Sequence, residues 1–159
     1  MIVWIDIETA FLFGPTVEIA VVMTNNDLHL LMSRWGVFHY DKEELWSGHK
    51  DRLEEFRKST LSLAEADENI SNAIIHTRQS EEKLILGGSS VTYDRTILQR
   101  DFPKVYALLH YRSIDVSTLR ELDDRWIGRK REAMPHTAMG DIKKDIAYLK
   151  RFKEERYDC

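Results

Sequence analysis

Hydrophobic and polar positions repeat with two different periods along this chain. In residues 1–8, 17–24 and 28–38 apolar side chains are dense or alternate with polar ones, which predicts three strands. The Asn-Asn-Asp sequence at 25–27 indicates a hairpin turn between the second and third strands. From residue 42 to 58 the apolar positions follow a helical period, and the stripe that they form contains His49.

The second half of the chain alternates helical patterns with short apolar segments. The pattern predicts a helix over 62–79, a buried strand at 84–86, a helix that starts near Asp94 and ends before Pro103, and a strand over 111–116. Helices over 117–126 and 137–155 follow. This order of elements predicts an α/β domain on a mixed sheet. No linker or repeat interrupts the 159 residues, of which 43% are hydrophobic, so we expect a single domain over 1–159.

Composition narrows the classes of protein that this sequence allows. Cys159 is the only cysteine, so no disulfide within the chain and no cysteine-based metal site is possible. No apolar run approaches the ~20 residues of a membrane span, and the N-terminus lacks the features of a signal peptide. We therefore expect a cytoplasmic protein with no membrane partner. The net charge of −4 argues against a protein that coats long nucleic acid, but not against one that binds a small anion.

The segment WIDIET (residues 4–9) places two carboxylates inside an apolar strand. Side chains two positions apart point to the same face of a strand, so Asp6 and Glu8 lie side by side. A divalent cation between them would relieve their repulsion, and carboxylate oxygens suit Mg²⁺ or Mn²⁺. The alternative is that the strand end reaches solvent and that both acids are ordinary surface residues.

Two later segments contain further candidate residues. Asp94 follows a Gly/Ser loop at a predicted helix start, where an acid is also common because it interacts favourably with the helix dipole. His136 precedes Asp141 by five residues near the start of the last helix, so both side chains could border one cleft. A structural or solvent-facing histidine is the alternative. We interpret Asp145, one turn beyond Asp141, as a solvated acid.

In order along the chain, these residues give D-x-E near the N-terminus, an aspartate in mid-chain and H-x₄-D near the C-terminus. Four carboxylates can hold two metal ions that activate a water in phosphodiester hydrolysis, and a neutral histidine can accept the proton of that water. This order and chemistry resemble the DEDDh class of 3′→5′ exonucleases. The resemblance implies a ribonuclease H-like α/β fold with a mixed sheet flanked by helices.

Nearly the whole chain resembles the oligoribonuclease family, through the segments WIDIE, GGSSVTYDR, HYRSIDVSTLRELDDRW and HTAMGDI. The resemblance implies hydrolysis of short single-stranded RNA, dinucleotides above all, from the 3′ end to nucleoside 5′-monophosphates. It implies two divalent cations, Mg²⁺ or Mn²⁺, bound by Asp6, Glu8, Asp94 and Asp141. By the same resemblance, His136 is the general base.

The family also closes a cap on the 5′-phosphate of its substrate, and the residues of that cap fall here on Ser90, Arg112, Ser117 and Thr118. A guanidinium group can bind a phosphate with two hydrogen bonds. Hydroxyl and amide groups at a predicted helix start favour an anion. The alternative for each residue is ordinary, namely a strand arginine or a helix cap.

Three further residues are assigned by the resemblance alone. Leu12 falls, by its spacing from the D-x-E motif, on a leucine that wedges between bases, although Phe11 is also available. Tyr111 and His49 fall on residues that a partner subunit brings to the active site, which implies a homodimer. A packed interface histidine is an equal alternative for His49.

The loop after the D-x-E motif departs from the family, because it is shorter than usual and Thr9-Ala10-Phe11 replaces the usual Met-Thr-Gly. This departure bears on dinucleotide preference more than on the catalytic set. A 3′→5′ single-strand deoxyribonuclease of the same fold and a dinucleotide-binding module without turnover are the alternative functions.

Overall fold

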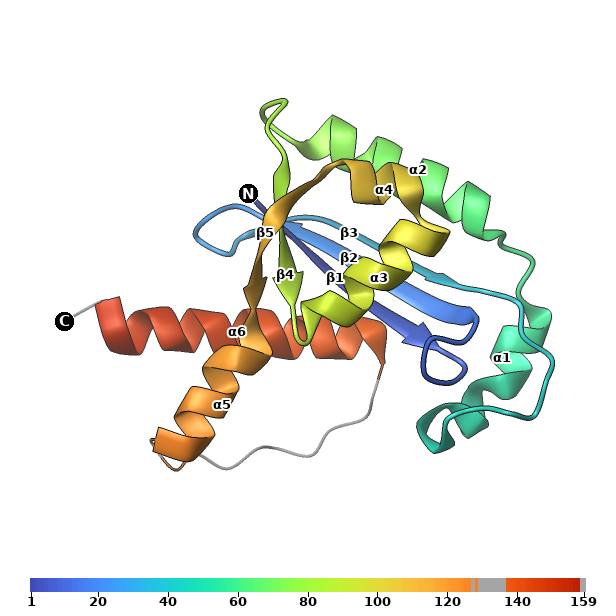
Figure 1. Ribbon diagram of the computed structural model, residues 1–159. Coiled ribbons are helices and arrows are strands. Elements are labelled where there is room, and N and C mark those ends of the chain that lie inside the picture. Colours follow the sequence, from blue (N-terminus) through green and yellow to red (C-terminus); the bar gives the residue numbers. More distant parts are fainter. Residues whose placement is uncertain (127, 129–136, 158–159) are drawn as a thin grey trace.

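The computed structural model describes residues 1–126, 128 and 137–157, and a mixed sheet of five strands runs through this part of the chain (Figure 1). β1 (Ile2–Thr9), β2 (Thr16–Thr24) and β3 (Leu30–Val37) follow one another as antiparallel neighbours. β4 (Leu84–Gly88) and β5 (Leu109–Asp115) add parallel strands on the other side of β1, which gives the order β3-β2-β1-β4-β5. The predicted α/β domain on a mixed sheet is confirmed.

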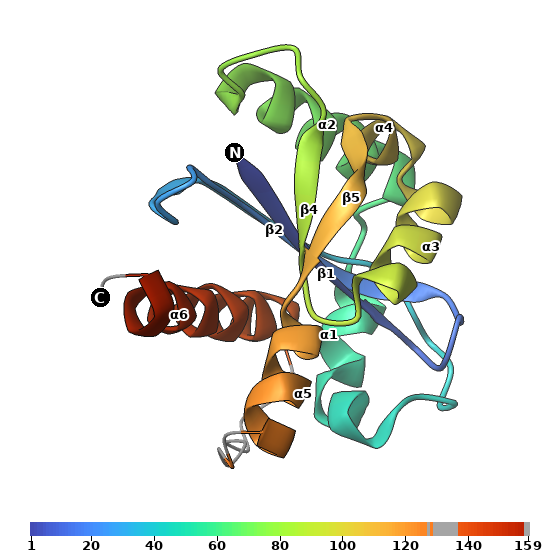
Figure 2. The same ribbon diagram turned by 60° about the vertical axis from the view of Figure 1, so that its left-hand side comes forward.

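Helices cover both faces of the sheet (Figures 1 and 2). α2 (Leu63–Thr77), α3 (Val91–Asp101) and α4 (Pro103–Ala107) pack on one face. α6 (Ala138–Tyr157) crosses the other face, and α5 (Val116–Trp126) packs beside it. The 3₁₀ turn η1 (Ser47–Arg52) and α1 (Leu53–Lys58) lie near the C-terminal end of β1, over a small apolar cluster around Phe56. Within the described ranges, no helix is long and apolar enough to cross a membrane.

The alternation of side chains along β1 decides which face receives its acids. Val3, Ile5 and Ile7 are buried in the core that α2, α3 and α4 cover. Ile2 and Trp4 point to the opposite face and are buried with Ile142 and Leu149 of α6. Because Asp6 and Glu8 continue this second row, they lie on the α6 face of the sheet.

β4 pairs with β1 over a short length, and a glycine permits the close approach. A Cβ atom at Gly87 would stand 2.7 Å from the ring of Trp4, so a larger residue would not fit there. The predicted strand over 84–86 left this glycine outside, but β4 includes it. The pairing with β1 covers only Ile2 to Trp4. The two strands separate beyond that point, so the Ile7 N–H of β1 can bond a side chain instead of β4.

One of the helix predictions needs correction. The helix predicted over 42–58 starts only at residue 47, because the preceding segment makes other contacts: the Tyr40 hydroxyl donates to the Glu44 carbonyl (2.5 Å) and the Trp46 amide to the Ala10 carbonyl (2.8 Å). The helix predicted near Asp94 ends before Pro103 as expected, because α3 runs from Val91 to Asp101. Pro103 is the first residue of the separate short helix α4, a position where no intrahelical N–H bond is lost.

Candidate active site

Three acidic side chains meet where the end of β1 approaches the start of α6. Thr137 fixes the first turn of α6, because its carbonyl accepts the N–H of Asp141 (2.9 Å) and its hydroxyl accepts the N–H of Gly140 (3.1 Å). This turn places Asp141 over the acids of β1. One carboxylate oxygen from each of Asp6, Glu8 and Asp141 lies within 4.8 Å of the other two. The structure therefore brings together three of the four predicted metal ligands.

Asp94 reaches the same end of β1 from the other side, on the first turn of α3. Its Oδ1 accepts the N–H of Ile7 at 2.9 Å, at a point where β4 no longer pairs with β1. The side chain is almost completely buried. Asp94 is not part of the close group of three carboxylates, but its charge acts on Asp6.

Asp6 and Asp94 are held in an environment that disfavours their charge. Burial raises the pKa of Asp6 well above its ordinary value of 3.8, and the neighbouring acids, Asp94 first, raise it further. Burial also raises the pKa of Asp94 to about 7, although the Ile7 N–H opposes this shift. Among the described residues, no lysine or arginine forms an ion pair with Asp6, Glu8 or Asp94. Asp141, in contrast, accepts a hydrogen bond from Lys144 Nζ at 2.6 Å. With several hard oxygen donors and no lysine or arginine on its other three acids, the site fits a divalent cation such as Mg²⁺ or Mn²⁺.

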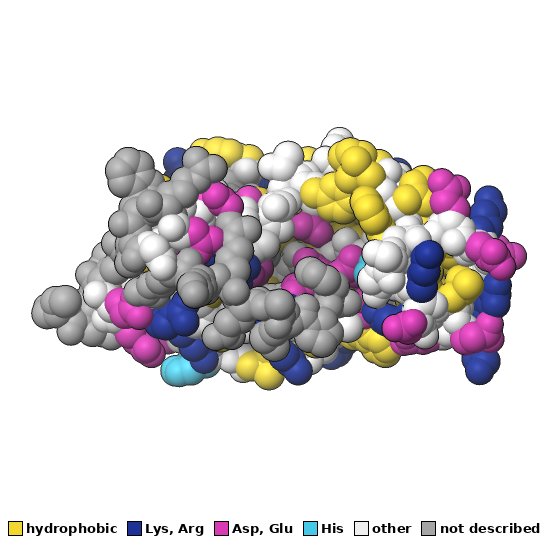
Figure 3. Space-filling model, turned by 90° about the horizontal axis from the view of Figure 1, so that it is seen from below, with side chains coloured by type: hydrophobic (Ala, Val, Ile, Leu, Met, Phe, Trp, Pro, Cys, Tyr) yellow, Lys and Arg dark blue, Asp and Glu magenta, His cyan; other side chains and the backbone are white. Residues whose placement is uncertain are grey.

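The surface over this region is hollowed. Figure 3 shows acidic side chains inside a hollow near the middle of one face, with hydrophobic side chains along one rim. The predicted general base, His136, lies outside the described residues. Its neighbour Thr137 is described and directly precedes α6, four residues before Asp141.

His49 lies against the candidate metal site of its own chain. Its Nε2 is 3.0 Å from Oε2 of Glu8, and the side chain is 4% exposed. The resemblance implied that this histidine serves the site of a partner subunit, whereas the contact in the structure is with Glu8 of its own chain. The short η1 turn folds back over the end of β1, so His49 reaches Glu8 within one protomer.

Ser90 and Ser117 of the predicted phosphate cap are joined through an acid that the sequence did not single out. The carboxylate of Asp115 accepts the N–H groups of Ser90 (3.1 Å), Val91 (3.2 Å) and Ser117 (2.9 Å), and the Ser117 hydroxyl at 2.5 Å. Ser117 Oγ also accepts the Ser90 N–H at 3.3 Å. Asp115 therefore couples the start of α3 to the start of α5 and itself occupies donors that would suit an anion.

The other two cap residues lie at the surface. Arg112 places its guanidinium over the Tyr111 ring, 5.5 Å from the ring centre, and donates from Nε to the Tyr111 hydroxyl at 3.1 Å. Thr118 is exposed on α5. Among the described residues, no hydrogen bond joins Arg112 to Ser90, Ser117 or Thr118. Tyr111 is 76% exposed, which leaves most of its surface open to a substrate or a second subunit.

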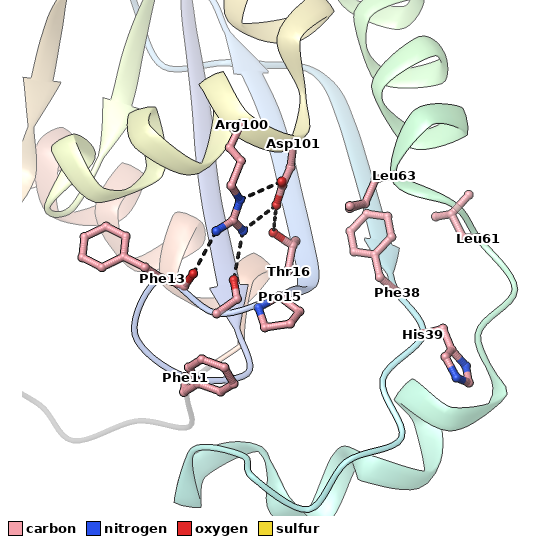
Figure 4. A pocket seen from close by; sticks show the side chains of 11 residues that line it. Phe11, Phe13, Pro15, Thr16, Phe38, His39, Leu61, Leu63, Arg100 and Asp101 are labelled. Carbon is pink, nitrogen blue, oxygen red and sulfur yellow. Dashed lines mark hydrogen bonds and ion pairs between the residues drawn. The ribbon is translucent and has the colours of Figure 1, made fainter.

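Leu12 lies on a loop, residues 10–15, that is fixed in place although its apolar side chains are exposed. Leu12 is 62% and Phe13 53% exposed. The Phe13 and Gly14 carbonyls accept hydrogen bonds from Arg100 at 2.8 and 2.9 Å (Figure 4). The Tyr93 hydroxyl accepts the Phe13 N–H at 3.2 Å. Phe13 adopts a φ of 57°, which is uncommon for a bulky residue. The loop after the D-x-E motif is thus held by hydrogen bonds and exposes apolar side chains that a nucleobase can contact.

A hollow of about 580 Å³ opens between this loop and the segment around Phe38 and Leu61 (Figure 4). Phe11 contributes to its wall, and Arg100 and Asp101 form one end. None of the four predicted metal-binding carboxylates lines it. It is therefore separate from the candidate catalytic group.

The interpretation of Asp145 as a solvated acid is wrong. Asp145 is 3% exposed, and its Oδ1 accepts hydrogen bonds from Ser89 (2.9 Å) and Arg120 (2.8 Å). Arg120 also donates to the Ser89 hydroxyl at 3.1 Å. Burial raises the pKa of Asp145, while Arg120 acts in the opposite direction. The acid is buried because α5 brings Arg120 over this turn of α6.

Glu18 is a further acid that sequence reasoning missed. It is 1% exposed and stands opposite Glu8 in the β1–β2 ladder. Its carboxylate accepts hydrogen bonds from Arg52 (2.6 and 3.2 Å), Trp35 Nε1 (2.5 Å) and the N–H of Ala138 (3.3 Å). A signal was present, because Glu18 is the single charged residue in a strand with every position buried.

Comparison with known proteins finds oligoribonucleases that are similar in sequence to this chain. It is 32% identical over 174 residues to an oligoribonuclease of Rhodococcus jostii (strain RHA1), which covers 98% of this chain and 87% of the relative. An oligoribonuclease of Mycobacterium ulcerans (strain Agy99) is also 32% identical over 174 residues (98% and 81% covered). One from Pseudomonas aeruginosa (strain UCBPP-PA14) is 30% identical over 170 residues (96% and 94%). No protein-family model matches the chain.

Solved structures of exonucleases share the fold. Exonuclease I from Methylocaldum szegediense superposes with a TM-score of 0.71 at 14% identity, over 99% of this chain, which spans 41% of the length of that protein. Exonuclease X, in complex with 5′ overhanging duplex DNA, gives a TM-score of 0.54 at 19% identity (98% and 93% covered). These likenesses confirm the predicted ribonuclease H-like exonuclease fold. The sequence identity to relatives that match it over most of their length shows, in turn, that the chain belongs to the oligoribonuclease family.

Proposed function

We propose that this protein is a metal-dependent 3′→5′ exoribonuclease that degrades short oligoribonucleotides to nucleoside 5′-monophosphates. The observation that carries the proposal is the group formed by Asp6, Glu8 and Asp141, whose ligand oxygens lie within 4.8 Å of one another. Membership of the oligoribonuclease family connects that group with RNA hydrolysis. A protein that only binds would gain little from buried acids that repel one another.

The carboxylates would hold two divalent cations, Mg²⁺ or Mn²⁺, with Asp94 as the fourth ligand of the predicted set. Bound there, such ions activate a water and stabilise the leaving oxygen in phosphodiester hydrolysis. The protein contributes by holding the ligands in place before binding. The Ile7 amide orients Asp94, and the first turn of α6 orients Asp141.

His136 is the proposed general base. The support for this role is its position in the H-x₄-D pattern, because the residue lies outside the described part of the chain. An imidazole has a pKa near the operating pH and can accept the proton of the attacking water.

Short substrates are favoured by what surrounds the metal group. Ser90, Ser117, Thr118 and Arg112 would bind the 5′-phosphate near the starts of α3 and α5, and the exposed Leu12 would contact a base. In the described structure Asp115 occupies the Ser90 and Ser117 amides and also the Ser117 hydroxyl. We therefore expect the Ser90 and Thr118 hydroxyls and Arg112 to make most of the phosphate contacts.

A homodimer is part of the proposal. Tyr111 is 76% exposed on β5, at an edge of the sheet, and it stacks only against its neighbours His110 and Arg112 among the described residues. An exposed aromatic side chain with a polar tip is typical of an interface anchor. A second subunit would give Tyr111 its partner and would bring it toward the substrate.

The test compares 5′-phosphorylated RNA dinucleotides, 20-mer RNA and 20-mer single-stranded DNA in Mn²⁺, with chromatography of the released nucleotides. We expect 5′-monophosphates from RNA, released fastest from dinucleotides. Asp94→Asn should abolish turnover. Asp67→Asn is the matched control, since Asp67 is equally buried but accepts the amides of Lys104 and Val105 in α4, away from the site. Faster hydrolysis of DNA would favour a deoxyribonuclease, and tight binding without products would favour a binding module.

A further inference from the structure

His49 is fixed on Glu8 from several directions. Its Nε2 lies 3.0 Å from Glu8 Oε2, and its ring packs edge-on against Phe56 with ring centres 6.3 Å apart. The backbone N–H of His49 donates to the Trp46 carbonyl at 2.9 Å. Only 4% of the side chain is exposed, whereas Glu8 is 20% exposed. The buried partner therefore restrains the more exposed one.

The second ring nitrogen identifies the role of this contact. Nδ1 of His49 is buried and has no hydrogen-bond partner among the described residues. Burying an N–H group without an acceptor is more costly than burying a bare nitrogen, so the proton belongs on Nε2. His49 then donates to Glu8, and the bond fixes one carboxylate oxygen and leaves the other oxygen for a metal.

The η1 turn also provides a positive charge for Glu18, the acid opposite Glu8. Glu8 and Glu18 are direct partners in the β1–β2 ladder, and like charges in that position repel. Arg52, three residues after His49, donates to Glu18 at 2.6 Å. The η1 turn thus places one donor on each of the two paired glutamates. This arrangement restricts both side chains from a single element.

We propose that His49 is a positioning residue that acts within its own protomer and holds the Glu8 carboxylate ready to bind metal. The inference rests on the proposed function, since it takes Glu8 as a metal ligand. It changes what the family resemblance implied for this residue, because the partner subunit is not needed to supply it. Residues that hydrogen-bond a metal ligand without touching the metal typically contribute to affinity, and their removal weakens metal binding by about 10- to 100-fold.

Metal titration without substrate tests the role directly. His49→Phe keeps an aromatic ring but removes the donor, and it should weaken Mn²⁺ binding about tenfold in calorimetry. His49→Gln keeps an N–H donor at similar reach and should bind nearly as the unmodified protein does. Tyr40→Phe is the control, since Tyr40 is buried in the small cluster around Phe56 and its hydroxyl, among the described residues, bonds the Glu44 carbonyl alone. Equal affinity of His49→Phe and the unmodified protein would overturn the proposal, as would an equal loss in Tyr40→Phe.

The proposed metal site is checked separately with Asp141→Asn. If that variant binds Mn²⁺ as well as the unmodified protein, the metal site itself is refuted, whatever His49 does. If His49→Phe does not fold, the ¹⁵N spectrum of the unmodified protein decides. We expect a proton on Nε2 of His49 that is protected from exchange, and loss of that protection in Glu8→Ala. A ring with a proton on Nδ1 and none on Nε2 would contradict the proposal.

Mixed subunits test whether His49 acts within its own protomer. Co-refolded His49→Phe and Asp141→Asn chains contain no protomer with both residues intact, so RNA hydrolysis should stay at the level of the His49→Phe chains alone. If the histidine acted on the other subunit, mixing would create a complete site and restore activity. Restored activity would therefore overturn the inference.

Discussion

Asp94 should make the metal-free protein less stable as the pH rises. The side chain is 3% exposed, and burial raises its pKa to about 7 from an ordinary value of 3.8. The folded protein therefore retains this proton to a higher pH than the unfolded chain does. The corresponding stabilisation is fully present below pH 3.8 and is lost as the pH rises through about 7.

The size of the effect follows from the same values. The interval between pKa values of 3.8 and about 7, at about 1.4 kcal/mol per pH unit, corresponds to a decrease in the free energy of unfolding on the order of 4 kcal/mol. Asp94→Asn removes the ionisation but keeps an oxygen that can accept the Ile7 N–H. The variant should therefore lack this part of the pH dependence while the fold is preserved.

Urea unfolding in EDTA, measured from pH 4.5 to 8.5, compares the two proteins. The unmodified protein should lose stability relative to Asp94→Asn as the pH rises, by up to about 4 kcal/mol at the alkaline end. Saturating Mn²⁺ at pH 8 should stabilise the unmodified protein and not the variant, since bound metal favours the ionised carboxylates. If the free energies of unfolding of the two proteins change with pH in parallel over the whole range, ionisation of Asp94 is not the cause of the pH dependence.

Three substitutions test hydrolysis, and a light-scattering measurement tests assembly. Asp141→Ala should abolish hydrolysis with the fold intact by circular dichroism, and retention of full Mg²⁺-dependent activity would exclude the two-metal mechanism. His136→Ala should reduce turnover about 10²- to 10⁴-fold while calorimetry still detects Mn²⁺ binding, whereas loss of metal binding would make it a ligand. Arg112→Ala should slow cleavage of 5′-phosphorylated dinucleotides at least about tenfold and that of 20-mers far less, because a charge-assisted hydrogen bond contributes about 1.5–3 kcal/mol; equal effects on both lengths would indicate a general exonuclease. Light scattering should find a dimer, and an active monomer of 18.7 kDa would contradict the role of Tyr111.

The sequence predicted the central acids because their placement depends on local periodicity. Asp6 and Glu8 follow Ile2 and Trp4 on one face of β1, and the period of two that defines a strand is enough to place them together. Asp141 was placed near the start of a helix in the same way, and α6 begins three residues before it. What periodicity could not provide was the separation of β1 and β4, which frees the Ile7 amide for Asp94.

Pairing between distant segments explains what sequence reasoning missed. Asp145 has the spacing of an exposed helix acid, and only the packing of α5 on α6 brings Arg120 to it. The residues before η1 have a helical pattern, but hydrogen bonds at Tyr40 and Trp46 compete with a helix there. His49 could not be assigned to one protomer or the other from sequence, because that depends on the direction in which the η1 turn folds.

The acids of this region fall into two groups that differ in how their charge is balanced. Glu18, Asp145 and Asp115 lie further out and are bonded by Arg52, by Arg120 and by helix amides. Asp6 and Asp94, at the centre, have no lysine or arginine partner among the described residues, and their pKa values are raised.

Buried carboxylates without a counter-charge are destabilising, and they persist in a folded protein where function requires them. The outer acids could each recruit a cation or an amide from a neighbouring element, so the fold is able to neutralise acids in this region. Asp94 accepts the Ile7 amide, but within the described chain neither Asp6 nor Asp94 has a lysine or arginine partner. The missing counter-charge is therefore specific to the centre. A divalent cation would supply the positive charge that the protein does not provide there, which links the electrostatics of the fold to the proposed hydrolysis of RNA.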